Sequence, residues 1–180
     1  MGENMQQLIM RWKNDGQKAK DLIVPDGVEI KNWTEIEKPL DKWLDIVQYG
    51  LTPKKEDEEY YNNCMFQYEY YKPQDTYFFL YNGQEVATVT VICDPVKKDG
   101  YIHMVATKQE ARGKGIGNLM AFHAVKVLKE KGMQTAHLTT DDFRIPAIKT
   151  YLKGGFFPDL STEDFKNRWE KINQTLNCGK

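Results

Sequence analysis

A glycine-rich segment at residues 112–117, with the sequence RGKGIG, lies between a predicted strand and a predicted helix. Glycines at such a junction let the backbone approach an anion closely, and the N–H groups at the helix start point outward. The helix dipole adds positive potential there, and Arg112 and Lys114 add mobile positive charge. We therefore expect this segment to hold a phosphate or a pyrophosphate, the alternative being a flexible turn between strand and helix.

The spacing of these glycines excludes two common phosphate sites. A P-loop requires Gly-x-x-x-x-Gly-Lys followed by Ser or Thr, and no Ser or Thr follows a Gly-Lys pair in this chain. A dinucleotide fingerprint requires Gly-x-Gly-x-x-Gly, but the completing positions hold Asn118 and Met120. That fingerprint also belongs to an early strand–helix–strand unit, whereas this segment follows an antiparallel meander.

Two motifs resemble elements of the GNAT acyltransferase superfamily. The pattern Arg-x-x-Gly-x-Gly, from Arg112 to Gly117, resembles the acyl-CoA-binding motif of that family. Downstream, at the expected distance, Ala147-Ile148, Tyr151 and Gly155-Phe156 resemble its closing AI-x-x-Y-x-x-x-GF element. The second match makes the resemblance specific, because the first hexapeptide alone would be weak.

The resemblance implies an α+β fold, the GNAT acyl-CoA N-acyltransferase fold, in which helices flank a mixed and mostly antiparallel central sheet. It covers residues 76–158, and residues 28–51 match only as a strand followed by a helix. One position departs from the family pattern, which often has Asn where this chain has Arg144. Arg144 either binds a phosphate or a backbone carbonyl, or pairs with Asp141 or Asp142; the pairing is favoured.

The family resemblance implies acetyl-CoA as the co-substrate. The pyrophosphate would rest on the glycine-rich turn, and the pantetheine arm would run beside the preceding strand. A backbone N–H of that strand would polarise the thioester carbonyl, a role worth about 10²–10³-fold in rate. The residues carried over as cofactor-binding are Met104, Val105, Ala106, Thr107, Arg112, Gly113, Lys114, Gly115, Ile116, Gly117, Asn118, Arg144 and Tyr151. No residue is assigned to a metal.

Two residues are predicted to be catalytic. Tyr151 matches the family's tyrosine acid, which protonates the leaving thiolate, and a tyrosine with its ordinary pKa near ~10 stays protonated at neutral pH. The alternative for Tyr151 is a buried tyrosine that packs on Ile148. His103 is the candidate general base, although a histidine in a strand is more often structural. A water chain to a carboxylate is an equal alternative, and His137 has a weaker claim.

The acceptor pocket of this family is built from the early helices and the loop between them. An aromatic pocket flanked by acidic residues would suit a cationic amine. The simpler interpretation, which we favour, is that most of these rings pack in the core or on the surface and that the acidic run Glu56–Glu59 is a solvated helix start. The rings concerned are Trp33, Trp43, Tyr49, Tyr60, Tyr61, Phe66, Tyr68, Tyr70 and Tyr71.

Hydrophobic periodicity predicts the elements that position these residues. Asn82-Gly83 joins two strongly apolar segments and is a hairpin signal. The expected elements are strands at 28–33, 76–81, 85–93, 101–107 and 136–140, a short strand from 156, and helices at 40–51, 54–66, 116–131, 145–153 and 161–176. We expect one GNAT domain over 1–180, with an N-terminal arm or helix (1–23), an acceptor side (24–72), an acyl-CoA-binding core (76–158) and an extra C-terminal helix (161–176).

The composition excludes several other classes of protein. The 180 residues carry 25 Lys and Arg against 26 Asp and Glu, so the near-neutral charge argues against a nucleic-acid binder. No apolar segment approaches the ~18 residues of a membrane span, and the three cysteines form no metal or disulfide pattern. We therefore expect a cytoplasmic monomer or homodimer. The leading hypothesis is an N-acetyltransferase that acts on a primary amine; a non-catalytic acyl-CoA-binding regulatory module is the alternative, and a nucleotide-binding protein the weakest.

Overall fold

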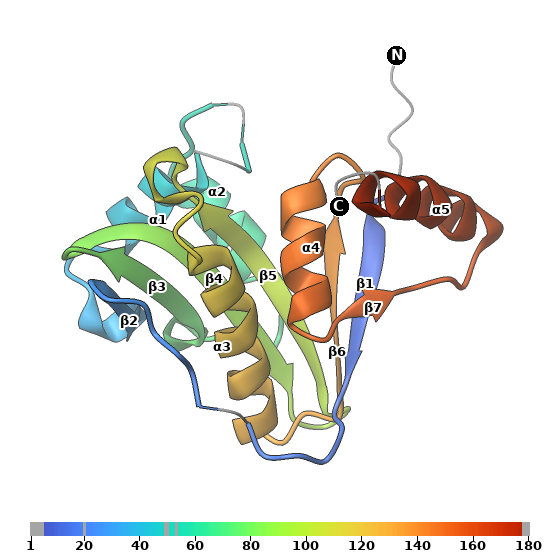
Figure 1. The fold of residues 1–180 in the computed structure, drawn as a ribbon. Helices are drawn as coiled ribbons and strands as arrows, with labels where there is room; N and C mark the ends of the chain where they lie inside the picture. The colour runs from blue at the N-terminus through green and yellow to red at the C-terminus, as the bar shows by residue number, and fades with distance from the viewer. Residues whose placement is uncertain (1–5, 20, 49–50, 53, 178–180) are drawn as a thin grey trace.

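A seven-stranded mixed sheet forms the centre of the computed structural model, which describes residues 6–19, 21–48, 51–52 and 54–177 (Figure 1). The strands lie in the order β2-β3-β4-β5-β6-β1-β7. Only the β5–β6 pair is parallel among the pairs described; the others are antiparallel. The strands are β1 (Leu8–Lys13), β2 (Val28–Asn32), β3 (Thr76–Tyr81), β4 (Gln84–Asp94), β5 (Asp99–Thr107), β6 (Thr135–Thr140) and β7 (Phe157–Pro158).

Helices cover both faces of this sheet. On one face α1 (Pro39–Val47) and α2 (Glu58–Met65) enclose an aromatic core with residues of β3, β4 and β5. On the other face α3 (Ile116–Glu130), α4 (Ile145–Lys153) and α5 (Glu163–Asn177) enclose the larger apolar core (Figure 1). The predicted fold class, a mostly antiparallel sheet flanked by helices with an added C-terminal helix, is confirmed.

The central hairpin forms where the sequence predicts it. Asn82 and Gly83 both have positive φ angles, 49° and 78°, as a two-residue hairpin turn requires. All residues from Val86 to Ile92 are buried, because α1 covers one face of β4 and α3 the other. This strand is therefore the rigid centre on which the neighbouring β5 is built.

The N-terminal arm or helix expected over residues 1–23 contains a strand instead of a helix. Residues 8–13 form the strand β1, which pairs antiparallel with β6 in the interior of the sheet. Leu8, Met10 and Trp12 are buried on one face, while Arg11 and Lys13 are exposed on the other. A four-residue spacing such as that of Leu8 and Trp12 fits both a strand and a helix, and Met10 decides for the two-residue period of a strand.

Two helices of the acceptor side are shorter than predicted. The helix expected at 40–51 ends at Val47, and residues 49–50 lie outside the described part of the chain. The helix expected at 54–66 begins at Glu58, because the Asp57 carboxylate accepts a hydrogen bond from the Tyr60 N–H (3.1 Å) and caps it.

The start of α5 is capped by the Thr162 hydroxyl, which accepts from the Phe165 N–H at 3.1 Å.

Gly100 lies inside β5, which begins at Asp99, two residues before the strand expected at 101–107. The turn occupies residues 95–98, where Lys98 has a φ of 53°. A Cβ on Gly100 would collide with the Leu128 side chain of α3. The glycine therefore lets α3 pack closely against β5, and this fixes the helix that begins at the glycine-rich turn.

Candidate functional site

Strands β5 and β6 diverge beside the predicted site (Figure 1). Their parallel pairing runs from Asp99 opposite Thr135 to Ile102 opposite Leu138 and then stops. We call the ends beyond this pairing, residues 103–107 of β5 and 139–140 of β6, the fork. The backbone edge of β5 that faces β6 is therefore unpaired by β6 along the fork.

A β-bulge lies in the β5 arm of the fork. Thr88 of β4 pairs with Ala106 and Thr90 with His103, so Met104 and Val105 together oppose one residue of β4. Met104 adopts a left-handed conformation with a φ of 50°. Such a conformation costs a non-glycine residue of the order of 1–3 kcal/mol and is concentrated at functional sites. The extra residue of a bulge is left out of the ladder, so a backbone group is available here to a ligand.

The glycine-rich turn leads directly into α3. Gly113 and Gly115 have φ angles of 77° and 78°, and a Cβ on either would meet no atom within 4 Å. Space in front of the turn is therefore open. The first hydrogen bond across the helix start runs from the Leu119 N–H to the Gly115 carbonyl (3.1 Å). The preceding N–H groups, from Ile116 to Asn118, point out of the helix end and provide the anion-binding donors that the sequence predicts.

The two basic residues of the turn differ in direction. The Lys114 ammonium lies 4.5 Å from the centre of the Tyr81 ring, which places it on the β3 side of the turn. Arg112 follows a short 3-10 helix, Gln109–Ala111, that links the β5 arm to the turn. Both lie in the segment where phosphate charge is expected.

Arg144 forms the ion pair that was the favoured alternative. Its Nε donates to Asp141 Oδ2 at 2.8 Å, and its guanidinium lies 5.3 Å from the centre of the Phe143 ring. Phe143 is 75% exposed, so it lies at the surface beside the fork. Arg144 immediately precedes α4, which carries Tyr151.

Tyr151 is buried on the inner face of α4. Only 8% of it is exposed, and its ring makes an edge contact with Phe156. Burial, opposed by the positive charge of Arg144 and aided by the nearby Tyr101, raises its pKa to about 12. The hydroxyl therefore keeps its proton throughout the neutral range, as a general acid must.

His103 lies on the opposite face of the sheet, against α2. Its Nε2 donates to the Cys64 carbonyl oxygen at 3.2 Å, which requires the proton on Nε2. The rings of Tyr68 and Tyr101 pack on it at 5.0 and 4.9 Å. Burial lowers the pKa of His103 to about 4, and the hydrogen bond to Cys64 opposes the shift. The ring is neutral at pH 7 and is a weak base.

Two residues that the sequence reasoning missed meet at the base of the fork. The Tyr101 hydroxyl lies 3.4 Å from Thr139 Oγ1, which joins β5 to β6 just past the last paired residues. The Tyr101 ring is stacked between His103 and His137, and His137 Nδ1 donates to Asp99 Oδ2 at 3.1 Å. Alternation along β5 could have indicated Tyr101, because it is two residues from His103 and shares its face.

The aromatic residues of the acceptor side are mostly packed in the core, as the favoured interpretation had it. Trp43, Tyr61 and Tyr71 are at least nine-tenths buried, and the Tyr61 and Tyr71 hydroxyls bond each other at 2.8 Å. Trp33 stacks on Tyr61 at 5.1 Å. Tyr49 lies outside the described residues. Tyr68 lies beside the fork, with its ring 5.0 Å from that of His103.

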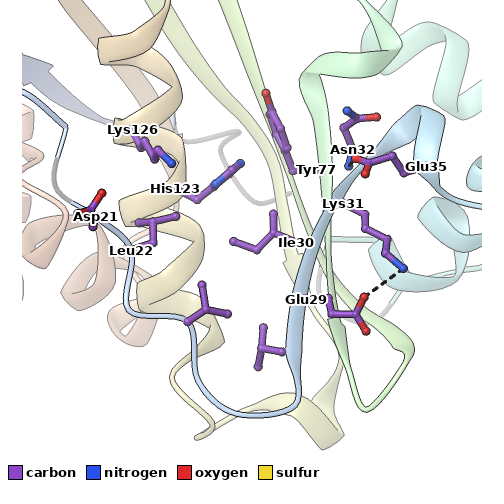
Figure 2. A pocket seen from close by; sticks show the side chains of 12 residues that line it. Asp21, Leu22, Glu29, Ile30, Lys31, Asn32, Glu35, Tyr77, His123 and Lys126 are labelled. Carbon is purple, nitrogen blue, oxygen red and sulfur yellow. Dashed lines mark hydrogen bonds and ion pairs between the residues drawn. The ribbon is translucent and has the colours of Figure 1, made fainter.

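A separate hollow of about 660 Å³ lies between α3, β2 and the segment 21–28 (Figure 2). His123 and Tyr77 line it in an edge-to-face contact of 4.4 Å. Within the described part of the chain neither buried ring nitrogen of His123 has a hydrogen-bond partner, and burial lowers its pKa to about 4. None of the residues predicted from the sequence motifs lines this hollow.

The described helices include none that is long and apolar enough to cross a membrane. Across the same part of the chain, no three His, Cys, Asp or Glu side chains are grouped so that they could hold a metal ion.

Comparison with known proteins gives one family and one fold. Residues 33–156 match the profile of the "Acetyltransferase (GNAT) family". A mycothiol acetyltransferase of Arthrobacter sp. (strain FB24) is 33% identical over 57 residues, which are 32% of this chain and 18% of that protein.

Two solved structures illustrate the shared fold. A GCN5-related N-acetyltransferase from Sphaerobacter thermophilus has a TM-score of 0.68 at 18% identity, over 86% of this chain and 50% of that one. Arabidopsis thaliana Naa50, in complex with the bisubstrate analogue CoA-Ac-MVNAL, has a TM-score of 0.53 at 22% identity, over 73% and 83% of the two chains. The chain thus spans about half the length of the first structure and under a fifth of the curated relative.

Proposed function

Because this chain belongs to the GNAT family of acetyltransferases, we propose that it transfers an acetyl group from acetyl-CoA to a primary amine in a ternary complex. The observation that carries the proposal is the position of the open glycine turn at the start of α3, beside the bulged arm of β5, whose edge toward β6 is left unpaired by β6. One element is suited to a pyrophosphate and the other to an extended amide chain.

The turn and the β5 arm would hold acetyl-CoA, which supplies an activated thioester. The N–H groups from Ile116 to Asn118 would bind the pyrophosphate, with Arg112 and Lys114 adding positive charge. The backbone edge from Met104 to Thr107 that faces away from β4 would pair with the amides of the pantetheine arm. The analogue bound by Naa50, which contains CoA, supports this assignment.

The residues around the fork would stabilise the charges that develop during transfer. A backbone N–H at the Met104–Val105 bulge would donate to the thioester oxygen as negative charge builds on it. Tyr151, buried and protonated, would give its proton to the departing sulfur. The guanidinium of Arg144 would supply positive charge at the start of α4, near Tyr151.

Removal of the amine proton is assigned to the acceptor side of the fork. His103 is neutral but weakly basic there, since its pKa is about 4. The alternative, a water chain to a carboxylate, has a natural end point in Asp99, which lies on the Tyr101 face of β5 and is hydrogen-bonded to His137. We favour proton transfer to Asp99 through water, with the Tyr101 and Thr139 hydroxyls at the end of this chain nearest the fork.

The same proposal includes an amine acceptor that enters from the α1 and α2 side, a monomer or homodimer, and a cytoplasmic location. The second candidate function, a non-catalytic acyl-CoA-binding module, would retain the turn and the bulge but would need no acid. The presence of Tyr151 at the position of the motif's tyrosine acid favours the enzyme.

Release of free CoA thiol in the presence of acetyl-CoA and a panel of primary amines tests the proposal. Thiol release that depends on one amine, together with the acetylated product, supports the transferase. Acetyl-CoA binding without transfer to any amine of the panel would favour the binding module. Tighter binding of ATP or NAD than of CoA would contradict both.

A further inference from the structure

Arg168 is a buried arginine on α5, outside every motif that the sequence singled out. Only 8% of its side chain is exposed. Its Nε and Nη2 donate to the two carboxylate oxygens of Asp142, at 3.0 and 2.5 Å, in a bidentate pair. Its Nη1 donates to the Gln6 carbonyl at 2.9 Å and to Asp164 Oδ2 at 3.0 Å. The arginine thus ties α5 and the N-terminal segment to a single loop, at residues 141–144.

This loop is held at a second point. Asp141 accepts from Gln7 Nε2 at 2.9 Å on one carboxylate oxygen and from Arg144 Nε at 2.8 Å on the other. The Arg144 N–H also donates to the Asp141 carbonyl at 3.0 Å. Two consecutive aspartates therefore fix the loop, one through Arg168 and one through Arg144.

The loop occupies a decisive place in the candidate site. It joins the β6 arm of the fork to α4, so it connects one wall of the fork to the helix that carries Tyr151 (Figure 1). It also presents Arg144 and the exposed Phe143 beside the fork. A displacement of this loop would move a predicted cofactor contact, whereas Tyr151 is anchored separately by the core.

We propose that Arg168 is a positioning residue: its bidentate pair with Asp142 holds the loop 141–144 in the conformation that binds acetyl-CoA, and so sets the affinity for that co-substrate. This inference rests on the proposed function and deepens it, because it assigns a role to the added C-terminal helix. The pair is strongly formed, since Arg168 lowers the pKa of Asp142 and Asp142 raises that of Arg168. A guanidinium is needed, because the ammonium of a lysine cannot make the bidentate contact.

Arg168→Lys and Asp142→Asn test the role with little change in volume. If the unpaired loop adopts the binding conformation about a tenth of the time, the Kd for acetyl-CoA rises about 10-fold in each variant. The double variant should be no weaker than either single one, because both remove the same contact. Lys166→Met is the matched control, because it removes an exposed ion pair with Glu163 on the same helix and should leave the Kd unchanged.

Calorimetry with acetyl-CoA gives both the Kd and the fraction of binding-competent protein, and hydrogen exchange follows the amides of residues 141–144. The proposal expects a higher Kd at unchanged stoichiometry, with faster exchange confined to the loop. A purely structural role would lower the thermal midpoint or the stoichiometry and leave the Kd and the local exchange as in wild type, which would overturn the proposal. Wild-type protein that does not bind acetyl-CoA would instead overturn the proposed function on which it rests.

Discussion

Replacing Tyr151 with phenylalanine removes one hydroxyl from α4 and leaves the packing of the ring in place. The ring is buried against Phe156 and the core around Ile148, so the free energy of unfolding should change by only about 1 kcal/mol. A positioned proton donor contributes about 10²–10⁴-fold to such a reaction. The turnover number should therefore fall by that factor, which is about 3 to 5 kcal/mol in barrier height.

The pKa of Tyr151 sharpens this prediction. Because burial raises the pKa to about 12, the hydroxyl stays protonated as the pH rises through 8 and 9. The wild-type rate should therefore show no alkaline decline caused by this residue below about pH 11. An alkaline decline near pH 9 that disappears in Tyr151→Phe would contradict a donor buried in this way.

CoA thiol release measures the turnover number, and calorimetry measures acetyl-CoA affinity. We expect Tyr151→Phe to lower the turnover number and to leave the affinity nearly intact. Tyr77→Phe is the matched control, since it removes a hydroxyl from a ring that lines the hollow beside β2 and should leave both quantities unchanged. A turnover number within twofold of wild type in Tyr151→Phe would remove this residue from the mechanism.

Three further predictions concern the turn, the buried histidines and the core. Gly115→Ala should weaken acetyl-CoA binding about 10-fold or more, as measured by calorimetry. Gly132→Ala is the control, because it bears the same backbone strain at the other end of α3 and should leave the affinity unchanged. Equal affinities in the two variants would refute the anion site. The free energy of unfolding should fall as the pH drops from 7 to 5, because unfolded histidine binds a proton near its ordinary pKa of ~6.5 while folded His123 has a pKa of about 4. In urea titrations, His123→Leu should remove about 2 kcal/mol of that loss. An unchanged pH dependence in this variant would count against the buried, neutral His123. Gly100→Ala should lower stability by about 1–3 kcal/mol in thermal unfolding because its Cβ collides with Leu128, and an unaltered midpoint would contradict the packing.

Local patterns were sufficient for the centre of the fold. The apolar residues on both faces of β4 predict a strand covered on both sides, and α1 and α3 provide that cover. The apolar stripe of α3, which includes Leu119, Ala124 and Leu128, is buried as its helical spacing predicts. The turn at Asn82-Gly83 has the backbone conformation that these residue types favour.

The N-terminal strand has a weaker local signal than these elements. Leu8 and Trp12 fit either period, and β1 gains its place by pairing with β6, which lies more than 120 residues later in the chain. Such a pairing depends on the tertiary arrangement, which no short segment of sequence encodes. The alternation of Leu8, Met10 and Trp12 was the signal available.

In the candidate site, too, residues of contiguous motifs could be predicted and long-range contacts could not. The turn and Tyr151 belong to contiguous motifs and could be predicted. The Tyr101–Thr139 contact joins residues 38 positions apart, and the Arg168–Asp142 pair joins residues 26 positions apart on separate elements. These contacts arise from strand register and helix packing, so only the folded chain reveals them.

The proposed acetyltransferase activity is measured directly by following a labelled acetyl group from acetyl-CoA to a primary amine. Mass spectrometry of the amines after incubation with wild-type protein, Tyr151→Phe and Gly115→Ala follows both substrates at once. We expect a labelled amide and one equivalent of free CoA with wild type, and strongly reduced amounts with both variants. Bound acetyl-CoA with no labelled amide from any amine, or equal transfer by all three proteins, would contradict this expectation.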